Sequence, residues 1–276
     1  MTVMFPVSYF LLVPLGFLVG AYGTLIGAGG GFLLVPLLIL MYPDEKRALI
    51  ASISLAVVFF NAGSGSWAYA RMKRIDYRSG LLFSSAAVPG AVLGALSTSW
   101  LPRPVFDVTF AAVMIATSVF LFLHPGAVER TLPDGAARGC QRTLTDAGGV
   151  SHSYSYSRAR GLLLAFAVGY VSSLLGTGGG IIHVPAMIRF LGFPVHIATA
   201  TSHFVLAITA LAGTVVHIAE GTFTRGIWRT AFLSVGVLAG AQVGARLSTR
   251  IHGTWIVRGL AIALGLVGVR ILLTVL

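Results

Sequence analysis

The chain has 276 residues, of which 56% are hydrophobic and 10% are charged, and its mean hydropathy is +0.90. This composition excludes a soluble domain, because uncharged runs longer than the ~18 residues of a spanning helix recur along the chain. The net charge of +11 comes from Lys and Arg residues in short connectors, so it predicts membrane topology rather than nucleic-acid binding. The single cysteine, Cys140, excludes a disulfide framework and a cysteine-based metal site.

The first half of the chain, residues 1–123, is predicted to form one transmembrane repeat. Its apolar segments cover about residues 5–26, 32–42, 48–70, 79–101 and 105–123. The first segment has no basic flank before it, so we interpret it as a permanent helix rather than a signal peptide. The segment 32–42 is only eleven residues long, which is roughly 16 Å of helix or half a bilayer. A broken or re-entrant element is therefore expected there.

Residues 124–158 are predicted to be a flexible polar linker between two halves. They are rich in Gly, Ser, Thr and Arg and contain no long apolar run. A small folded insert is the alternative. The connector 71–78 and the linker both carry several Arg residues, so the positive-inside rule predicts that both lie on the cytoplasmic side.

The second half, residues 159–276, repeats the organisation of the first. Its apolar segments cover about residues 160–175, 181–191, 197–219, 228–247 and 255–275. Residues 27–36 and 176–185 are identical at six of ten positions, at an offset of 149. The offset becomes 150 further on, where Ser52 and Gly90 match Ser202 and Gly240. These matches predict that one unit was duplicated.

The predicted fold class is an all-α polytopic membrane protein with two duplicated halves of four to five transmembrane segments each. Five crossings per half give inverted repeats. Four crossings per half, with re-entrant segments after the glycines, give parallel repeats. The charges of the connectors do not separate eight crossings from ten. Glycine-rich broken or re-entrant helices in an inverted repeat are the favoured arrangement.

Two glycine turns are the strongest candidates for a binding site. They consist of Gly27, Gly29, Gly30 and Gly31 in the first half and Gly176, Gly178, Gly179 and Gly180 in the second. A short helix leaving each turn presents free N–H groups and the positive end of its dipole. Glycine also lets a ligand approach without a Cβ in the way. The pair therefore predicts an anion site near the membrane midplane, and the alternative is that the glycines only allow close helix packing.

Hydroxyl groups follow the glycine turns. Thr201, Ser202 and His203 are the only dense cluster of donors inside an apolar segment, and Ser52 lies in the corresponding segment of the first half. We predict that these residues contact the substrate anion. The alternative is that the hydroxyls bond to their own or a neighbouring helix. Asn61, a lone amide in an apolar segment, is expected to bond between helices.

Few titratable groups lie inside the apolar segments, and such groups are functional candidates. They are His183, His203 and the pair His217–Glu220, so coupling of transport to protons through one of them stays open. Asp107 is expected to cap the start of a helix. The sequence contains no buried acid placed beside a histidine and no cluster of histidines and acids. We therefore predict no enzymatic activity, no metal site and no cofactor.

The paired motif Gly-x-Gly-Gly-Gly-x4-Pro resembles that of the sulfite exporter TauE/SafE family of membrane transporters. The matching residues are Gly27, Gly29, Gly30, Gly31, Val35 and Pro36, and Gly176, Gly178, Gly179, Gly180, Val184 and Pro185. The resemblance covers essentially the whole chain, including the Ala-Thr-Ala-Thr-Ser-His stretch at 198–203. It implies a multi-pass inner-membrane carrier for small anions, especially sulfite or organosulfonates. The first half departs from a symmetric site, because it has no equivalent of the hydroxyl-rich stretch.

We therefore predict a secondary transporter of a small sulfur oxyanion in the plasma (inner) membrane. Its predicted partners are the anionic substrate and the lipid bilayer, with no nucleic acid. An uncoupled anion channel or facilitator is one alternative, which the scarcity of membrane carboxylates favours. A membrane assembly protein without transport activity is another. The substrate, the direction of transport, the coupling ion and a homo-oligomer are not determined by the sequence.

Overall fold

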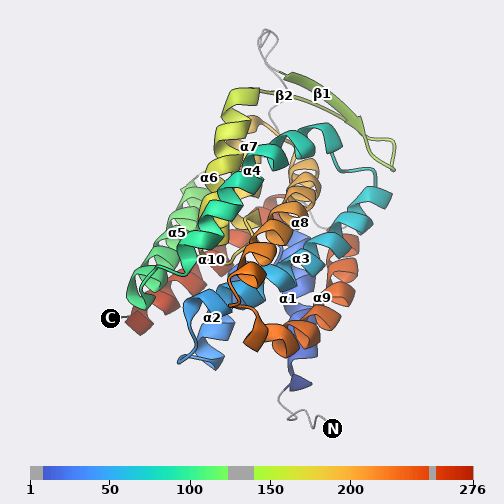
Figure 1. The fold of residues 1–276 in the computed structure, drawn as a ribbon. Coiled ribbons are helices and arrows are strands. Elements are labelled where there is room, and N and C mark those ends of the chain that lie inside the picture. The colour runs from blue at the N-terminus through green and yellow to red at the C-terminus, as the bar shows by residue number, and fades with distance from the viewer. Residues whose placement is uncertain (1–8, 124–139, 249–252, 276) are drawn as a thin grey trace.

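The computed structural model describes residues 9–123, 140–248 and 253–275, and these residues are almost entirely helical (Figure 1). The first half contains α1 (Leu12–Ile26), α2 (Gly31–Met41), α3 (Arg47–Arg71), α4 (Tyr77–Thr98) and α5 (Arg103–Leu123). The second half contains α6 (Arg158–Leu174), α7 (Gly180–Leu191), α8 (Val195–Ala219), the 3-10 turn η2 (Thr224–Gly226), α9 (Ile227–Leu247) and α10 (Gly253–Val275). The predicted all-α class is confirmed.

The protein crosses the membrane several times. In the described part of the chain, α3, α4, α5, α8 and α9 contain segments long and apolar enough to span a bilayer. Large apolar side chains stand exposed on the outer surface of the bundle, among them Leu18, Leu81, Leu163, Leu211 and Val235. A water-soluble protein rarely exposes so much apolar surface, whereas lipid solvates it.

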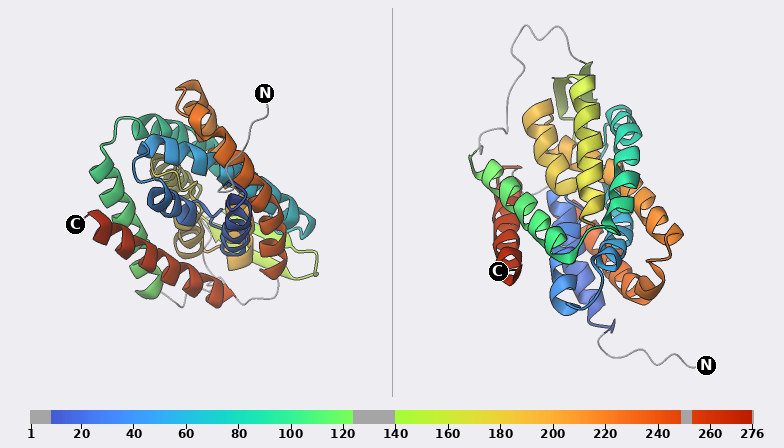
Figure 2. Two further views of the ribbon diagram at one scale, coloured as in Figure 1. Left: turned by 90° about the horizontal axis from the view of Figure 1, so that it is seen from below. Right: turned by 60° about the vertical axis from the view of Figure 1, so that its left-hand side comes forward.

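The two short helix pairs occupy opposite ends of the bundle. In Figure 2 (right), α1 and α2 lie in the lower half of the molecule and α6 and α7 in the upper half. Each pair is broken by a turn with left-handed backbone, in which Gly27 and Gly30 have φ of 85° and 79°, and Gly176 and Gly179 have φ of 69° and 106°. Only glycine adopts such angles without strain. The helices are therefore broken where the glycine motifs predicted.

Helices of one half pack mainly on helices of the other. The pairs in contact are α1 with α9, α4 with α6, α3 with α8, and α5 with α10. Glycines allow the closest approaches: a Cβ at Gly90 or Gly94 would strike the backbone of α6, and one at Gly240 or Gly244 would strike that of α1. Close backbone contact of this kind gives helices their packing energy in a bilayer.

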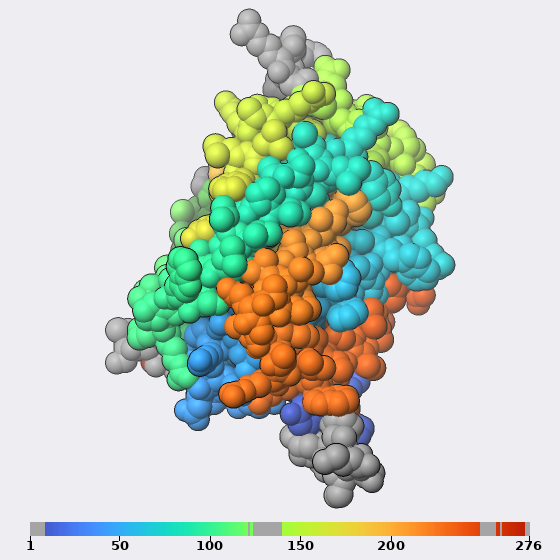
Figure 3. Space-filling view, in the orientation of Figure 1, coloured from blue at the N-terminus to red at the C-terminus, as the bar shows by residue number. Residues whose placement is uncertain are grey.

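Residues 140–156 form a β-hairpin rather than a linker without structure. Strand β1 (Cys140–Thr145) pairs antiparallel with β2 (Ser151–Tyr156), and the turn is held by Asp146, whose Oδ1 accepts from the N–H groups of Gly148 and Val150. The expectation of a flexible linker is therefore wrong for these residues, because side chains of the hairpin bond to the helical bundle. The remainder of the expected linker, residues 124–139, lies outside the described residues. Figure 3 shows the hairpin against the ends of α3 and α4.

Candidate functional site

The two glycine turns pack directly against each other inside the bundle. A Cβ on Gly31 would strike the carbonyl of Thr177, and a Cβ on Gly180 would strike the backbone of Gly27 and Ala28. The side chains of Val58 and Leu206, from α3 and α8, lie beside both turns. The structure thus brings together the eight glycines that the sequence singled out, and close packing is one of their roles.

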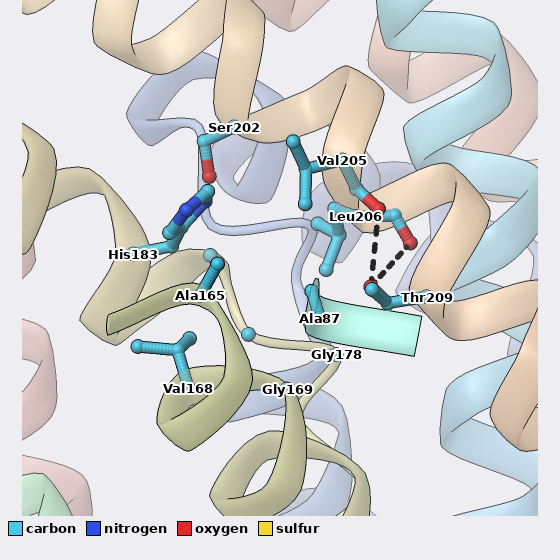
Figure 4. A pocket seen from close by; sticks show the side chains of 12 residues that line it. Ala87, Ala165, Val168, Gly169, Gly178, His183, Ser202, Val205, Leu206 and Thr209 are labelled. Carbon is cyan, nitrogen blue, oxygen red and sulfur yellow. Dashed lines mark hydrogen bonds between the residues drawn. The ribbon is translucent and has the colours of Figure 1, made fainter. Parts of the chain in front are cut away.

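A small cavity lies beside the second turn (Figure 4). It is lined by the turn itself, by α4, α6, α7 and α8, and by the side chains of Ala87, Ala165, Val168, His183, Ser202, Val205, Leu206 and Thr209. Its volume is about 10 Å³, which is room for about one water molecule. Ala87, Ala165 and Gly169 create this space because they carry little or no side chain.

His183 and Ser202 supply the polar groups of the cavity. Their side chains point toward each other in Figure 4, and they are only 4% and 0% exposed. His183 Nε2 and Ser202 Oγ make no hydrogen bond in the described part of the chain. A buried polar group without a partner is costly, so such groups in a native protein require an explanation.

The first N–H groups of α7 lie at the same place. The helix begins at Gly180, and no side chain caps it at Gly179. Its first N–H groups have no partner within the helix, and its positive dipole end lies at the cavity. The cavity therefore combines a helix N-terminus, a hydroxyl and an imidazole, which are the groups expected around an anion.

The first turn is different, because a hydrogen-bonded network fills the space beside it. Asn61 donates from Nδ2 to the carbonyl of Gly29 (2.9 Å) and accepts from Thr24 Oγ1 (3.1 Å). His203 Nε2 lies 3.3 Å from Thr24 Oγ1, and Tyr69 donates to the Thr24 carbonyl (2.8 Å). This confirms that Asn61 bonds between helices. It also separates His203 from Ser202, since His203 belongs to the network at the first turn.

Two other predicted site residues have structural partners. Thr201 Oγ1 accepts a hydrogen bond from the N–H of Asp76 (3.0 Å). Ser52 donates to the carbonyl of Leu49 in its own helix (2.8 Å). Of the hydroxyl residues predicted to contact substrate, only Ser202 lines the cavity with the glycines.

The remaining titratable groups lie away from the cavity. His217 Nδ1 and Glu220 Oε2 are 3.6 Å apart at the end of α8. Asp107 does not lie in the first turn of α5, and both its oxygens accept hydrogen bonds of 2.8 Å from Arg47, so the expected helix cap is replaced by an ion pair. No group of three or more metal-binding side chains occurs among the described residues.

His183 was visible in the sequence only as one of several intramembrane histidines. Its position in the cavity depends on Gly169 from α6 and on Ala87 from α4, which is far from it in the chain. Thr209 also lines the cavity, but its hydroxyl donates to the carbonyls of Val205 and Leu206 in its own helix. No local sequence pattern distinguishes the unpartnered His183 from Thr209, whose hydroxyl is bonded to its own helix.

The fold and the cavity define a multi-pass membrane protein with a buried polar site between broken helices, as in transporters. The family model for the sulfite exporter TauE/SafE family matches residues 12–271. The chain belongs to this family.

Proteins of known sequence agree with this assignment. The chain is 34% identical over 272 residues to the probable membrane transporter protein YunE of Bacillus subtilis, covering 96% of this chain and 97% of that protein. It is 23% identical over 277 residues to a probable membrane transporter protein of Methanocaldococcus jannaschii, covering 95% of each chain. It is 25% identical over 238 residues to YdhB of Bacillus subtilis, covering 86% of this chain and 89% of that one. No solved structure matches the chain.

Proposed function

We propose that the protein is a secondary transporter of a small anion, namely sulfite, an organosulfonate or a related sulfur oxyanion, and that the anion binds in the cavity at the start of α7. One observation supports this above all: His183 and Ser202 present unpartnered polar atoms to the N-terminus of an uncapped helix. The glycines Gly178–Gly180 allow an oxyanion to approach the backbone closely.

The energies involved are compatible with binding. A charge at the bilayer centre costs about 3 kcal/mol on the mildest scale. A helix N-terminus returns up to about 2 kcal/mol, and each hydrogen bond to a charged group contributes about 1.5–3 kcal/mol. The dipole of α7 with donors from Ser202 and His183 is therefore sufficient, whereas the dipole alone is not.

The site must open for transport to occur. A cavity for about one water molecule is too small for an anion of four or more heavy atoms. Binding therefore requires α4 or α6 to move away from α7 and α8. A site that opens and closes between rigid helix bundles is the basis of alternating access.

We further infer that the halves are inverted repeats. Contacts of the first turn recur at the second: Gly30 faces Val19 as Gly179 faces Val168, and Gly65 faces His203 as Gly213 faces Leu55. In this arrangement, each glycine-broken pair enters and leaves at one end, and three helices per half cross fully. Three crossings per half invert the second repeat relative to the first. The repeats would be residues 1–123 and 159–276.

Charge supports the orientation of these repeats. The hairpin end carries Arg71, Lys73, Arg74, Arg78, Arg142, Arg158, Arg160 and Arg189, and the other end carries Lys46, Arg47, Arg103, Arg225 and Arg229. By the positive-inside rule the hairpin end is cytoplasmic, in the plasma membrane. Cys140 on β1 should then react with a membrane-impermeant thiol reagent in inverted vesicles but not in intact cells.

The proposed repeat contains a single anion site. At the position related to His183 the first half has Leu34, and at the position related to Ala87 the second half has Val237. The space beside the first turn therefore has no imidazole and less room, and its polar groups bond to one another through Asn61 and Thr24. An uncoupled anion facilitator with the same site is the second candidate, because no carboxylate lines the cavity.

Transport by purified protein in liposomes tests the proposal. Labelled sulfite, sulfate and a sulfonate are offered to the wild type and to the variants Ser202→Ala, His183→Leu and Thr209→Val. We expect the first two to lose transport at least ten-fold. Thr209→Val should retain it, because its hydroxyl is committed to its own helix. Equal transport by all variants would contradict the site, and accumulation of anion driven by an imposed ion gradient separates a coupled carrier from a facilitator.

A further inference from the structure

One buried carboxylate of the bundle binds two side chains of the hairpin. Asp76, at the N-terminus of α4, accepts from Arg142 Nε (3.0 Å) and Nη2 (2.5 Å) and from the Tyr154 hydroxyl (2.7 Å). It also accepts from the N–H and hydroxyl of Ser79 (3.2 and 2.5 Å). The Ser79 and Tyr156 hydroxyls are 2.7 Å apart. Three hairpin side chains therefore hold the start of α4.

The same contacts reach the helix that carries Ser202. The N–H of Asp76 donates to Thr201 Oγ1 on α8, and Ser202 is the next residue. The tip of the hairpin is held separately, since Ala147 donates to the carbonyl of Met72 (3.0 Å) and Asp146 lies 3.5 Å from Arg74. Asp76, which the hairpin side chains hold, thus also links the start of α4 to the second turn of α8.

A column of aromatic rings joins the hairpin to the cavity. Tyr154 and Tyr156 lie against Phe193, with ring centroids 4.4 and 5.3 Å apart. Tyr156 lies against Phe83 at 5.4 Å, and Phe83 lies edge-on to His183 at 5.9 Å. Phe83 is fully buried and lies one helical turn from Ala87, toward the hairpin. Phe83 therefore lies between His183 of the cavity and Tyr156 of the hairpin.

We propose that the β1–β2 hairpin is the inner gate of the cavity: docked on Asp76 and Ser79, it holds Phe83 over His183, and its release lets the start of α4 move outward and connects the cavity to the hairpin end. This inference rests on the proposed function for the identity of the solute. Arg142 and Tyr154 are positioning residues in this scheme, because they hold the start of α4 in place and do not touch the anion.

The gate is tested by the accessibility of the cavity, which does not depend on transport. Ala87→Cys, in a Cys140→Ser background, places a thiol in the cavity lining. Its reaction with a membrane-impermeant methanethiosulfonate is followed in inverted vesicles and in intact cells. Arg142→Gln should raise the rate in inverted vesicles at least ten-fold and leave the rate in intact cells unchanged. Tyr154→Phe, which keeps the ring and removes one hydrogen bond, should raise it by a smaller factor.

The control is Arg189→Gln, which removes an exposed charge at the same end of the molecule. It should label like the parent. Equal rates for Arg142→Gln, Tyr154→Phe and the parent would overturn the gate, provided that size-exclusion profiles show folded protein. If the gate variants label faster while Ser202→Ala and His183→Leu transport normally, the gate stands and the anion site is wrong. If the gate variants label like the parent while Ser202→Ala and His183→Leu lose transport, the anion site stands and the gate is wrong.

Discussion

Gly180 of the second turn lies against the backbone of Ala28 in the first turn, without room for a Cβ between them. Gly31 makes the reciprocal contact with Thr177. Because each turn occupies the space beside the other, the two broken helix pairs are assembled as one unit at the centre of the bundle.

Alanine at either contact should therefore disrupt assembly. Gly180→Ala and Gly31→Ala would force a methyl group against the neighbouring backbone, and overpacking of this kind costs about 1–3 kcal/mol or more. We expect lower thermal stability and reduced recovery of folded protein in detergent. Gly63→Ala is the control, because a Cβ there would meet nothing within 4 Å and alanine is the better helix former. Comparable stability of Gly180→Ala and Gly63→Ala would contradict the packing role.

Loss of the Asn61 amide should destabilise the first turn. Asn61→Ala leaves the Gly29 carbonyl and the Thr24 hydroxyl without this partner, and an unsatisfied buried group costs about 1–3 kcal/mol. Thermal unfolding in detergent measures the effect. Ser54→Ala, about two turns earlier in the same helix, should change stability little, because the Ser54 hydroxyl has no partner to lose. A drop in stability that is equal for both variants would argue against the network.

Removing one partner of the Arg47–Asp107 pair should destabilise the protein more than removing both partners. Asp107→Asn leaves the guanidinium of Arg47 buried without its counter-ion, which costs about 3–5 kcal/mol. Replacing both, as Arg47→Met with Asp107→Leu, removes the uncompensated charge and should recover most of the stability. The measurement is again thermal unfolding of the single and double variants. A double variant as unstable as the single one would refute this account.

The glycine motifs predicted the breaks in the helices because positive φ is a local requirement that glycine alone meets easily. The register of the proposed repeat depends on contacts that are not local. If the halves are repeats as proposed, the contacts of the glycines would relate Val58 to Leu206 and Gly65 to Gly213, an offset of 148 over α3 and α8 where the isolated identities suggest 150. Ser202 would then correspond to Ser54 rather than Ser52. The reason is that the connector 192–194 is shorter than 42–46, and isolated identities do not detect such a change.

The hairpin was missed because its stability is not local. Its sequence is polar, which is typical of loops, and the alternation of Tyr154 and Tyr156 with serines was the only strand signal. The contacts that fix it lead to Asp76 and Ser79, more than sixty residues earlier in the chain. The cavity was missed for a similar reason, since small residues of α4 and α6 make space for a histidine of α7.

The docking of the hairpin should be insensitive to pH across the physiological range. Burial by itself would raise the pKa of Asp76, but hydrogen bonds from Arg142, Ser79 and Tyr154 lower it from 3.8 to about 2. A carboxylate with a lowered pKa contributes stability that is present above its ordinary pKa and is lost as the pH falls toward the lowered value. Docking should therefore be constant between about pH 8 and 5 and weaken only below about pH 4.

Electron paramagnetic resonance of a spin label on the hairpin measures this directly. The label is placed on the exposed Ser153 as Ser153→Cys, with Cys140→Ser, in nanodiscs. We expect an immobilised hairpin from pH 8 to 5 and increasing mobility as the pH falls from 4 toward 2. Adding Arg142→Gln should raise mobility already at pH 7 and shift the transition upward, because the main partner that favours the ionised Asp76 is removed. A mobility change centred between pH 6 and 7 would instead assign the docking equilibrium to a histidine and contradict the role given to Asp76.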